Sequence, residues 1–325
     1  MIVNTVLGAV DSADLGRTLI HEHLFASFPG AAFDPLRYIS KEELTAKCVS
    51  RLGRLKDIGV RTFVDPCPIE MGRDVELMAD VSRKTGVHIV CATGFYHEGP
   101  GIPYYWQGQS MQEIADFYIS EITHGIGKTG VKPGLIKCAT SKVPTELEER
   151  FLTAASMAHR ETGVPILTHT TGGLGGPEQQ AIFAKNGVEP HRCLIGHCCD
   201  NPDSHYHHEV ARGGTYIGFD RIGFDNPPSE VIAVNAAKLI ASGFEKQLMM
   251  SMDSCCHIQG KSIRKPPTED PVELKRLVDE GIWPPDQRYL FDTFVPMLRD
   301  EGLTDAQIMP VFDENPIRFF AGGRF

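Results

Sequence analysis

The sequence predicts a (β/α)8 barrel, and two observations lead to this fold class. Short β-branched or apolar runs recur along the 325 residues, and each is followed by an amphipathic helical pattern, which is typical of parallel strands joined by helical crossovers. The first run continues into His21-Glu22-His23, whereas a doubly wound open sheet would place a glycine-rich turn there. We therefore expect one barrel domain over residues 1–325, with an extra terminal helix and long rim loops.

The expected elements alternate along the chain, and local residues mark several of their ends. Ser40 is a favoured N-cap residue before the first helix, and Gly163 follows the fourth helix as a C-terminal glycine often does. The expected strands are Thr18–His21, Thr62–Asp65, His88–Ala92, Gly134–Cys138, Pro165–His169, Cys193–His197, Thr215–Phe219 and Leu248–Asp253. The expected helices are Glu42–Ile58, Asp74–Thr85, Met111–Ile126, Glu146–Thr162, Pro177–Asn186, Ser204–Arg212, Ser229–Ser242, Pro285–Glu301 and a terminal Asp305–Glu314.

Composition excludes several classes of function. The chain carries 32 Lys and Arg against 42 Asp and Glu, and its net charge of -10 argues against sequence-independent nucleic-acid binding. We see no basic run for an anionic membrane, no signal-peptide pattern and no apolar stretch of membrane-spanning length. The nine cysteines form no repeating framework and include two adjacent pairs, which indicates reduced thiols in a cytoplasmic protein.

Polar residues gather at the carboxyl ends of the expected strands, which meet at one rim of a barrel. His21 and His23 follow the first strand, and strand alternation would turn both imidazoles to the same face. His169, His197 and Asp253 end the fifth, sixth and eighth strands. A single strand-end histidine is more often a structural residue, but four with an aspartate suit zinc and related divalent ions.

Lys137 is unusual because it lies in the otherwise apolar run Gly134–Cys138. One interpretation is a lysine that reaches out of the barrel or pairs with a carboxylate. The other is that burial lowers its pKa, so that the neutral amine adds to carbon dioxide and becomes a carbamate. Such a carbamate could bridge two metal ions.

The order of these motifs resembles the phosphotriesterase family of the amidohydrolase superfamily over nearly the whole chain. The matching motifs are Gly16-x-Thr18-Leu19-x-His21-Glu22-His23, Ile136-Lys137-Cys138-Ala139-Thr140, Thr168-His169-Thr170, Ile195-Gly196-His197 and Asp253. The resemblance implies two divalent ions, with zinc expected and Mn, Co or Fe as alternatives. It also implies that His21, His23 and Asp253 bind one ion, that His169 and His197 bind the other, and that Lys137 bridges them as N6-carboxylysine.

Two further motifs look like the lactonase branch of that family. These are Gly94-Phe95-Tyr96 and Asp220-Arg221-x-Gly223-x-Asp225. The resemblance implies a hydrolase in which a metal-bridging hydroxide attacks a lactone or carboxylic ester, with promiscuous phosphotriesterase activity. Asp253 would accept the proton, while Tyr96 and Arg221 would assist. Alternatively, Tyr96 packs in the rim and Arg221 pairs with Asp220 or Asp225.

Other functions and partners stay open at this point. The alternatives are an organophosphate phosphotriesterase and an amidase or deaminase of the same superfamily, which typically uses one metal ion. We expect a small-molecule ester or lactone substrate and a homodimer, and the rim aromatics Phe25, Phe28, Phe33, Tyr104, Tyr105 and Trp106 could line a substrate channel or a dimer contact.

Two clusters of polar residues have both a functional and a structural interpretation. In the loop 257–285, Lys261, Arg264 and Lys265 could bind an acidic substrate, although a solvated loop with mixed charges explains them equally well. His205, His207 and His208 are expected on the surface of a helix.

Overall fold

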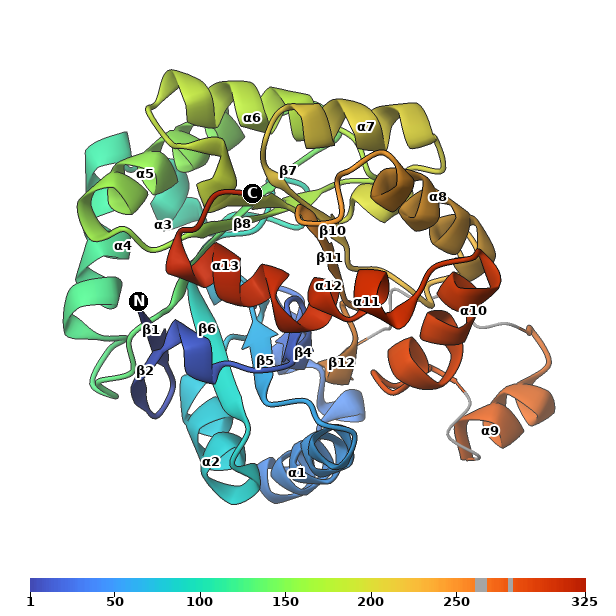
Figure 1. The fold of residues 1–325 in the computed structure, drawn as a ribbon. Coiled ribbons are helices and arrows are strands. Elements are labelled where there is room, and N and C mark those ends of the chain that lie inside the picture. The colour runs from blue at the N-terminus through green and yellow to red at the C-terminus, as the bar shows by residue number, and fades with distance from the viewer. Residues whose placement is uncertain (261–267, 280–282) are drawn as a thin grey trace.

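The computed structural model describes residues 1–260, 268–279 and 283–325, in which eight parallel strands are surrounded by helices (Figure 1). The strands are β3 (Thr18–Leu19), β5 (Thr62–Asp65), β6 (His88–Gly94), β7 (Leu135–Thr140), β8 (Ile166–Thr170), β9 (Cys193–Ile195), β10 (Tyr216–Phe219) and β11 (Leu248–Met250). They pair in sequence order, and every pairing is parallel. This confirms the predicted (β/α)8 fold class.

The first and last strands, β3 and β11, meet just beyond their carboxyl ends, and we call this contact the seam of the barrel. The amide of Asp253 donates to the carbonyl oxygen of His21 at 3.0 Å, and the amide of His23 donates to that of Ser254 at 3.1 Å. The chain then continues as the parallel pair β4 (His23–Ser27) and β12 (Cys255–Gln259). The expectation of an irregular chain after Asp253 was therefore wrong at β12, because β4 offers that segment a pairing edge.

Seven helices lie close to their expected bounds and cover the outside of the barrel (Figure 1). They are α1 (Lys41–Asp57), α2 (Val75–Thr85), α4 (Met111–His124), α5 (Glu146–Thr162), α6 (Gly176–Lys185), α7 (Ser204–Arg212) and α8 (Ser229–Ala241). The Ser40 hydroxyl accepts from the amide of Glu43, and Gly163 adopts a φ of 73° after α5. Both helix ends therefore follow from local sequence.

The rim loops and both ends of the chain contain elements that we did not expect. These are the antiparallel hairpin of β1 (Ile2–Thr5) and β2 (Gly8–Asp11), the helices α3 (Tyr104–Gln107) and α9 (Pro271–Asp279), and α13 (Asn315–Ala321). Short 3-10 helices occupy η1 (Ser12–Asp14), η2 (Ala31–Phe33), η3 (Pro35–Arg37), η4 (Ile69–Met71), η5 (Pro190–Arg192) and η6 (Cys198–Asp200).

The two expected C-terminal helices are shorter than predicted. The first begins as the π-helix η7 (Leu290–Phe294) and continues as α10 (Val295–Asp300). Before η7, the Gln287 side chain turns inward and binds Glu22 and Ser254. The second divides into α11 (Asp305–Ile308) and α12 (Pro310–Asp313), since a proline has no amide hydrogen to continue a helix.

The barrel interior is apolar at its base and polar at the carboxyl ends of the strands. Phe319 and Phe320 of α13 pack against interior residues such as Leu135 and Leu167, so this helix covers the base. Because side chains alternate along a strand, Lys137 follows Leu135 into the interior and His169 follows Leu167. Within the described residues, no helix combines the length and apolar composition needed to cross a membrane.

Candidate functional site

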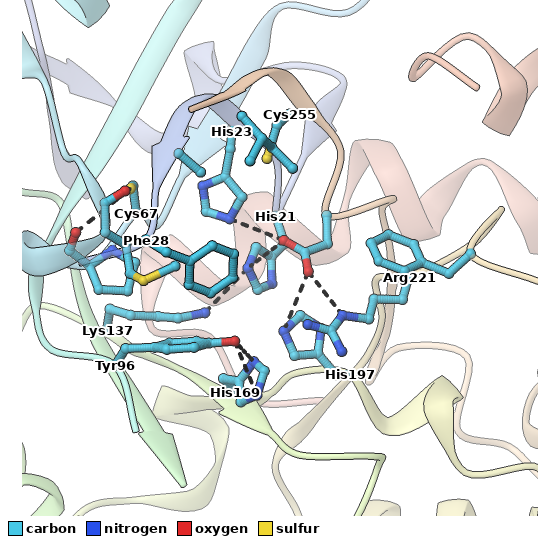
Figure 2. Close-up of a pocket in the computed structure, with 16 residues that line it drawn as sticks. His21, His23, Phe28, Cys67, Tyr96, Lys137, His169, His197, Arg221 and Cys255 are labelled. Atoms are coloured by element: carbon cyan, nitrogen blue, oxygen red, sulfur yellow. Dashed lines mark hydrogen bonds and ion pairs between the residues drawn. The ribbon is translucent and has the colours of Figure 1, made fainter. Parts of the chain in front are cut away.

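The predicted site residues line one cavity at the carboxyl ends of the strands (Figure 2). Its polar lining consists of His21, His23, Tyr96, Lys137, His169, His197, Arg221 and Asp253, and the remaining lining consists of Ala26, Phe28, Cys67, Pro68, Met71, Phe224, Cys255 and Ile258. Both polar and apolar side chains therefore line this cavity.

Several of these residues lie just past the strands rather than within them. His197 and Asp253 have φ angles of 59° and 49°, and this left-handed backbone ends β9 and β11 before the side chain is reached. His21 lies in the gap between β3 and β4. The expected strands therefore extended too far at their carboxyl ends, but the side chains still meet in the cavity.

Buried carboxylates orient three of the four imidazoles. Asp220 accepts hydrogen bonds from Nδ1 of His21 at 2.7 Å and from Nδ1 of His197 at 3.0 Å. Asp65 accepts one from Nδ1 of His23 at 2.9 Å. A carboxylate on Nδ1 selects the tautomer in which Nε2 carries a lone pair, which is the arrangement that metal-binding histidines use. Nε2 of each of these histidines lies 3.1–3.8 Å from a carboxylate oxygen of Asp253.

His169 completes the cluster from β8. Its ring lies 4.5 Å from that of His197 and 5.3 Å from that of His97, measured between centroids. Both of its ring nitrogens lie within hydrogen-bonding distance of the Tyr96 hydroxyl, at 3.3 and 3.4 Å. Gln179 donates to the carbonyl oxygen of His169 at 2.8 Å, which anchors the end of β8.

Lys137 points into the cavity and is 2% exposed, which contradicts the interpretation that it reaches out of the barrel. Its Nζ lies 3.2 Å from Nε2 of His21, and no carboxylate of the described residues lies within ion-pair distance of it. Burial lowers the pKa of Lys137 to about 8. A larger fraction of this amine is therefore neutral at physiological pH than for an ordinary lysine.

Arg221 forms ion pairs with two carboxylates at the rim, but neither belongs to the partners considered from sequence. Its Nε donates to Asp253 at 2.9 Å and its Nη1 donates to Asp200 at 2.8 Å, rather than to Asp220 or Asp225. Although burial opposes the shift, Arg221 and the neighbouring imidazoles hold the pKa of Asp253 well below its ordinary value. Asp253 is therefore a carboxylate that can accept a proton or bind a cation.

Tyr96 is partly buried, with its hydroxyl at the cavity. Its backbone amide donates to Glu70 at 2.7 Å, which fixes the loop after β6. Burial raises the pKa of Tyr96 to about 12, so the phenol stays protonated and can donate a hydrogen bond.

Sequence reasoning did not identify four carboxylates as supports of the cluster, although it considered one of them, Asp220, as a partner of Arg221. They are Glu22, Asp65, Asp200 and Asp220. A search for polar residues at the carboxyl ends of strands could have found two of them, because Asp65 ends β5 and Asp220 follows β10 directly. Glu22 is fully buried beside the seam of the barrel, and burial raises its pKa to about 7.

The three histidines named on the helix after the sixth strand do not line the cavity. His207 is buried rather than on the helix surface, and its Nε2 is bonded to the carbonyl oxygens of Cys198 and Asn201 at 3.0 and 2.9 Å. Lys261, Arg264 and Lys265 lie outside the described residues.

The donor set fits a metal centre. Ligand atoms of His21, His23 and Asp253 lie within 4.8 Å of one another, which is a spacing that one bound ion could span. Two other groups, His21–His197–Asp220 and His23–Asp65–Cys67, have similar spacing. In those two groups, the short distances between histidine and aspartate arise from the hydrogen bonds that Asp220 and Asp65 accept from histidine Nδ1 atoms.

Comparisons with known proteins agree on one family. The phosphotriesterase family matches residues 1–320. The chain is 36% identical to a phosphotriesterase homology protein of Mycobacterium tuberculosis, covering 98% of this chain and 97% of that protein. It is 33% identical to an aryldialkylphosphatase of Saccharolobus solfataricus, covering 96% and 97%. The solved structure of a mutant PTE-like lactonase of Deinococcus radiodurans superposes with a TM-score of 0.89 at 36% identity, covering 98% and 99%.

Proposed function

Because the chain belongs to the phosphotriesterase family of ester-bond hydrolases, we propose that it hydrolyses lactones or carboxylic esters in the cavity described above. The similarity to a solved PTE-like lactonase supports this substrate class, as does a protonated Tyr96 hydroxyl beside the cluster. Phosphotriesters form a second, weaker substrate class, which the similarity to an aryldialkylphosphatase supports.

One observation carries the proposal. Three buried imidazoles present Nε2 to Asp253 because Asp65 and Asp220 bind their Nδ1 atoms, and a buried lysine lies beside them. A cluster of this kind has little use as packing, since buried polar groups are costly unless they have a ligand or a partner.

The residues present would bind two divalent ions. We propose that His21, His23 and Asp253 bind one ion and that His169 and His197 bind the other, with Lys137 bridging as N6-carboxylysine. The carbamate forms when the neutral Nζ bonds to the carbon of carbon dioxide and releases a proton. Imidazole and carboxylate donors suit zinc, and Mn, Co and Fe are alternatives. Ions in such a site lower the pKa of a water molecule to about 7 and polarise a substrate oxygen.

The remaining residues act directly on the substrate and on the proton. Asp253 accepts the proton of the attacking water, and its pairing with Arg221 keeps its carboxylate ionised beforehand. Tyr96 donates a hydrogen bond to the oxygen on which charge develops. The apolar wall, which includes Phe28, Met71 and Ile258, holds the acyl part of the substrate and excludes water.

A substrate screen on metal-loaded protein tests this function. We would compare kcat/KM for lactones, aryl esters, phosphotriesters and N-acyl amides, and measure the metal content per chain. We expect two ions per chain and the highest kcat/KM with a lactone or carboxylic ester. One ion per chain with preferred amide hydrolysis would instead favour the amidase or deaminase alternative, and preferred phosphotriester hydrolysis would favour the phosphotriesterase.

We also propose a cytoplasmic homodimer in which residues 1–325 form one domain. All nine cysteines are free, which is consistent with a reducing compartment. Phe33 and Tyr104 are 89% and 90% exposed, and aromatic rings of this kind are enriched at protein interfaces. Light scattering on Phe33→Ser/Tyr104→Ser protein should give a monomer mass, and an unchanged mass would exclude these rings from the contact.

A further inference from the structure

Asp253 has a backbone conformation that needs support. Its φ of 49° lies in the left-handed region, which residues other than glycine rarely adopt unless their surroundings impose it. The amide of Asp253 donates to the carbonyl oxygen of His21, which anchors one side of the residue. This bond anchors the peptide group that precedes Asp253, and other contacts must hold the amides of Met252 and Ser254.

Glu22 binds the backbone amides of the residues before and after Asp253. One carboxylate oxygen accepts the amide of Met252 at 2.7 Å, and the other accepts the amide of Ser254 at 2.9 Å. Glu22 is 0% exposed and lies between β3 and β4, across the seam from Asp253. The carboxylate therefore fixes the turn from both sides of the residue that points into the cavity.

Gln287 in turn fixes Glu22. Its Nε2 donates to Oε2 of Glu22 at 3.1 Å and to the carbonyl oxygen of Ser254 at 3.0 Å. Gln287 is also 0% exposed, and it belongs to the segment before η7 rather than to the barrel. The side-chain amide of Gln287 thus connects the Glu22 carboxylate to the backbone of the turn that this carboxylate binds.

We propose that Glu22 and Gln287 are positioning residues that set the direction of the Asp253 carboxylate. This inference rests on the proposed function of Asp253 as proton acceptor. Neither side chain lines the cavity, so both act only through the turn at Met252–Ser254. Their loss should therefore lower turnover much more than substrate binding.

Gln287→Met tests the proposal, with Gln180→Met as its matched control. Both variants remove an Nε2 that donates to two acceptors, since Nε2 of Gln180 donates to Val210 and Thr215 at 2.7 and 2.8 Å, away from the cavity. We expect kcat of Gln287→Met to fall about 10–100-fold, as is usual when a supporting residue is lost, with KM changed less than about threefold. Gln180→Met should keep a kcat close to that of the unchanged protein at a similar loss of Tm.

A crystal structure of metal-free Gln287→Met provides a readout that does not depend on turnover. We expect the Asp253 carboxylate to be displaced from Nε2 of His23, where it now lies at 3.1 Å. An unmoved Asp253, or a kcat equal to that of Gln180→Met, would overturn the inference. If Gln287→Met does not fold, the isosteric Glu22→Gln carries the same two readouts, because its amide can accept from only one of the two peptide groups.

The failure of the proposed function would look different. In that case the unchanged protein would not hydrolyse the substrates, or Asp253→Asn would be as active as the unchanged protein. The inference fails separately if Asp253→Asn is inactive while Gln287→Met behaves like Gln180→Met.

Discussion

Replacing Asp220 by asparagine should weaken metal binding through a change of tautomer. Oδ1 of Asp220 accepts from the backbone amide of His197 at 2.6 Å and from its Nδ1 at 3.0 Å, while Oδ2 accepts from Nδ1 of His21 at 2.7 Å. An asparagine has one acceptor oxygen, which we expect to stay with the two donors of His197. Its NH2 group then faces Nδ1 of His21, which must become an acceptor, so the proton moves to Nε2.

A proton on Nε2 blocks the lone pair that would bind an ion. The loss of one supporting carboxylate typically lowers metal affinity about 10–100-fold, which corresponds to about 1.4–2.7 kcal/mol. We expect Asp220→Asn to lie near the upper end, because Asp220 is fully buried.

Competition with a chromogenic chelator would measure these affinities, and the Tm of the metal-free proteins would show whether the fold is intact. Asp313→Asn is the control, because Asp313 pairs with Arg17 away from the cavity and should leave metal affinity unchanged. An affinity of Asp220→Asn within about threefold of the unchanged protein would refute the tautomer argument, since the loss of a carboxylate that orients a metal-binding histidine normally lowers affinity more than this.

The other predictions concern the residues that would face the ions and the substrate. Lys137→Ala should lose most bound metal and activity, with partial rescue by a small added carboxylic acid; two ions per chain and full activity would exclude a bridging role. Asp253→Asn should lower kcat about 10²–10⁴-fold without unfolding the protein, and a loss below about tenfold would exclude it as proton acceptor. Tyr96→Phe should lower kcat/KM about 3–10-fold for lactones and esters, the size of one hydrogen bond, and less for activated phosphotriesters. Equal losses on both substrate classes would show that the hydroxyl does not discriminate between them.

The position of the metal-site residues at the strand ends could be predicted because it depends on strand periodicity and strand order. Apolar runs with helical patterns between them specify parallel strands, and the carboxyl ends of such strands meet at one rim. Lys137 and His169 follow interior leucines by two residues, so strand alternation turns them inward whatever the rest of the fold does. The motif order was equally visible, and the family match over residues 1–320 agrees with it.

The seam of the barrel could not be predicted, because it depends on contacts between residues far apart in the chain. No local pattern distinguishes Cys255–Gln259 from an irregular loop, and it becomes a strand only where β4 supplies a partner. The inward direction of the Gln287 side chain likewise depends on Glu22 being buried opposite to it.

By itself, the sequence determined which side chains reach the rim, since alternation and strand order are local properties that survive small errors in strand length. Tertiary structure alone decided how those side chains are held. Asp220 serves two histidines, Arg221 pairs with Asp200 and Asp253, and Glu22 supports the turn at Asp253. Each of these contacts joins residues from different parts of the barrel rim. Each also depends on side-chain direction, which is set only when the neighbouring strands and helices have packed around the residue.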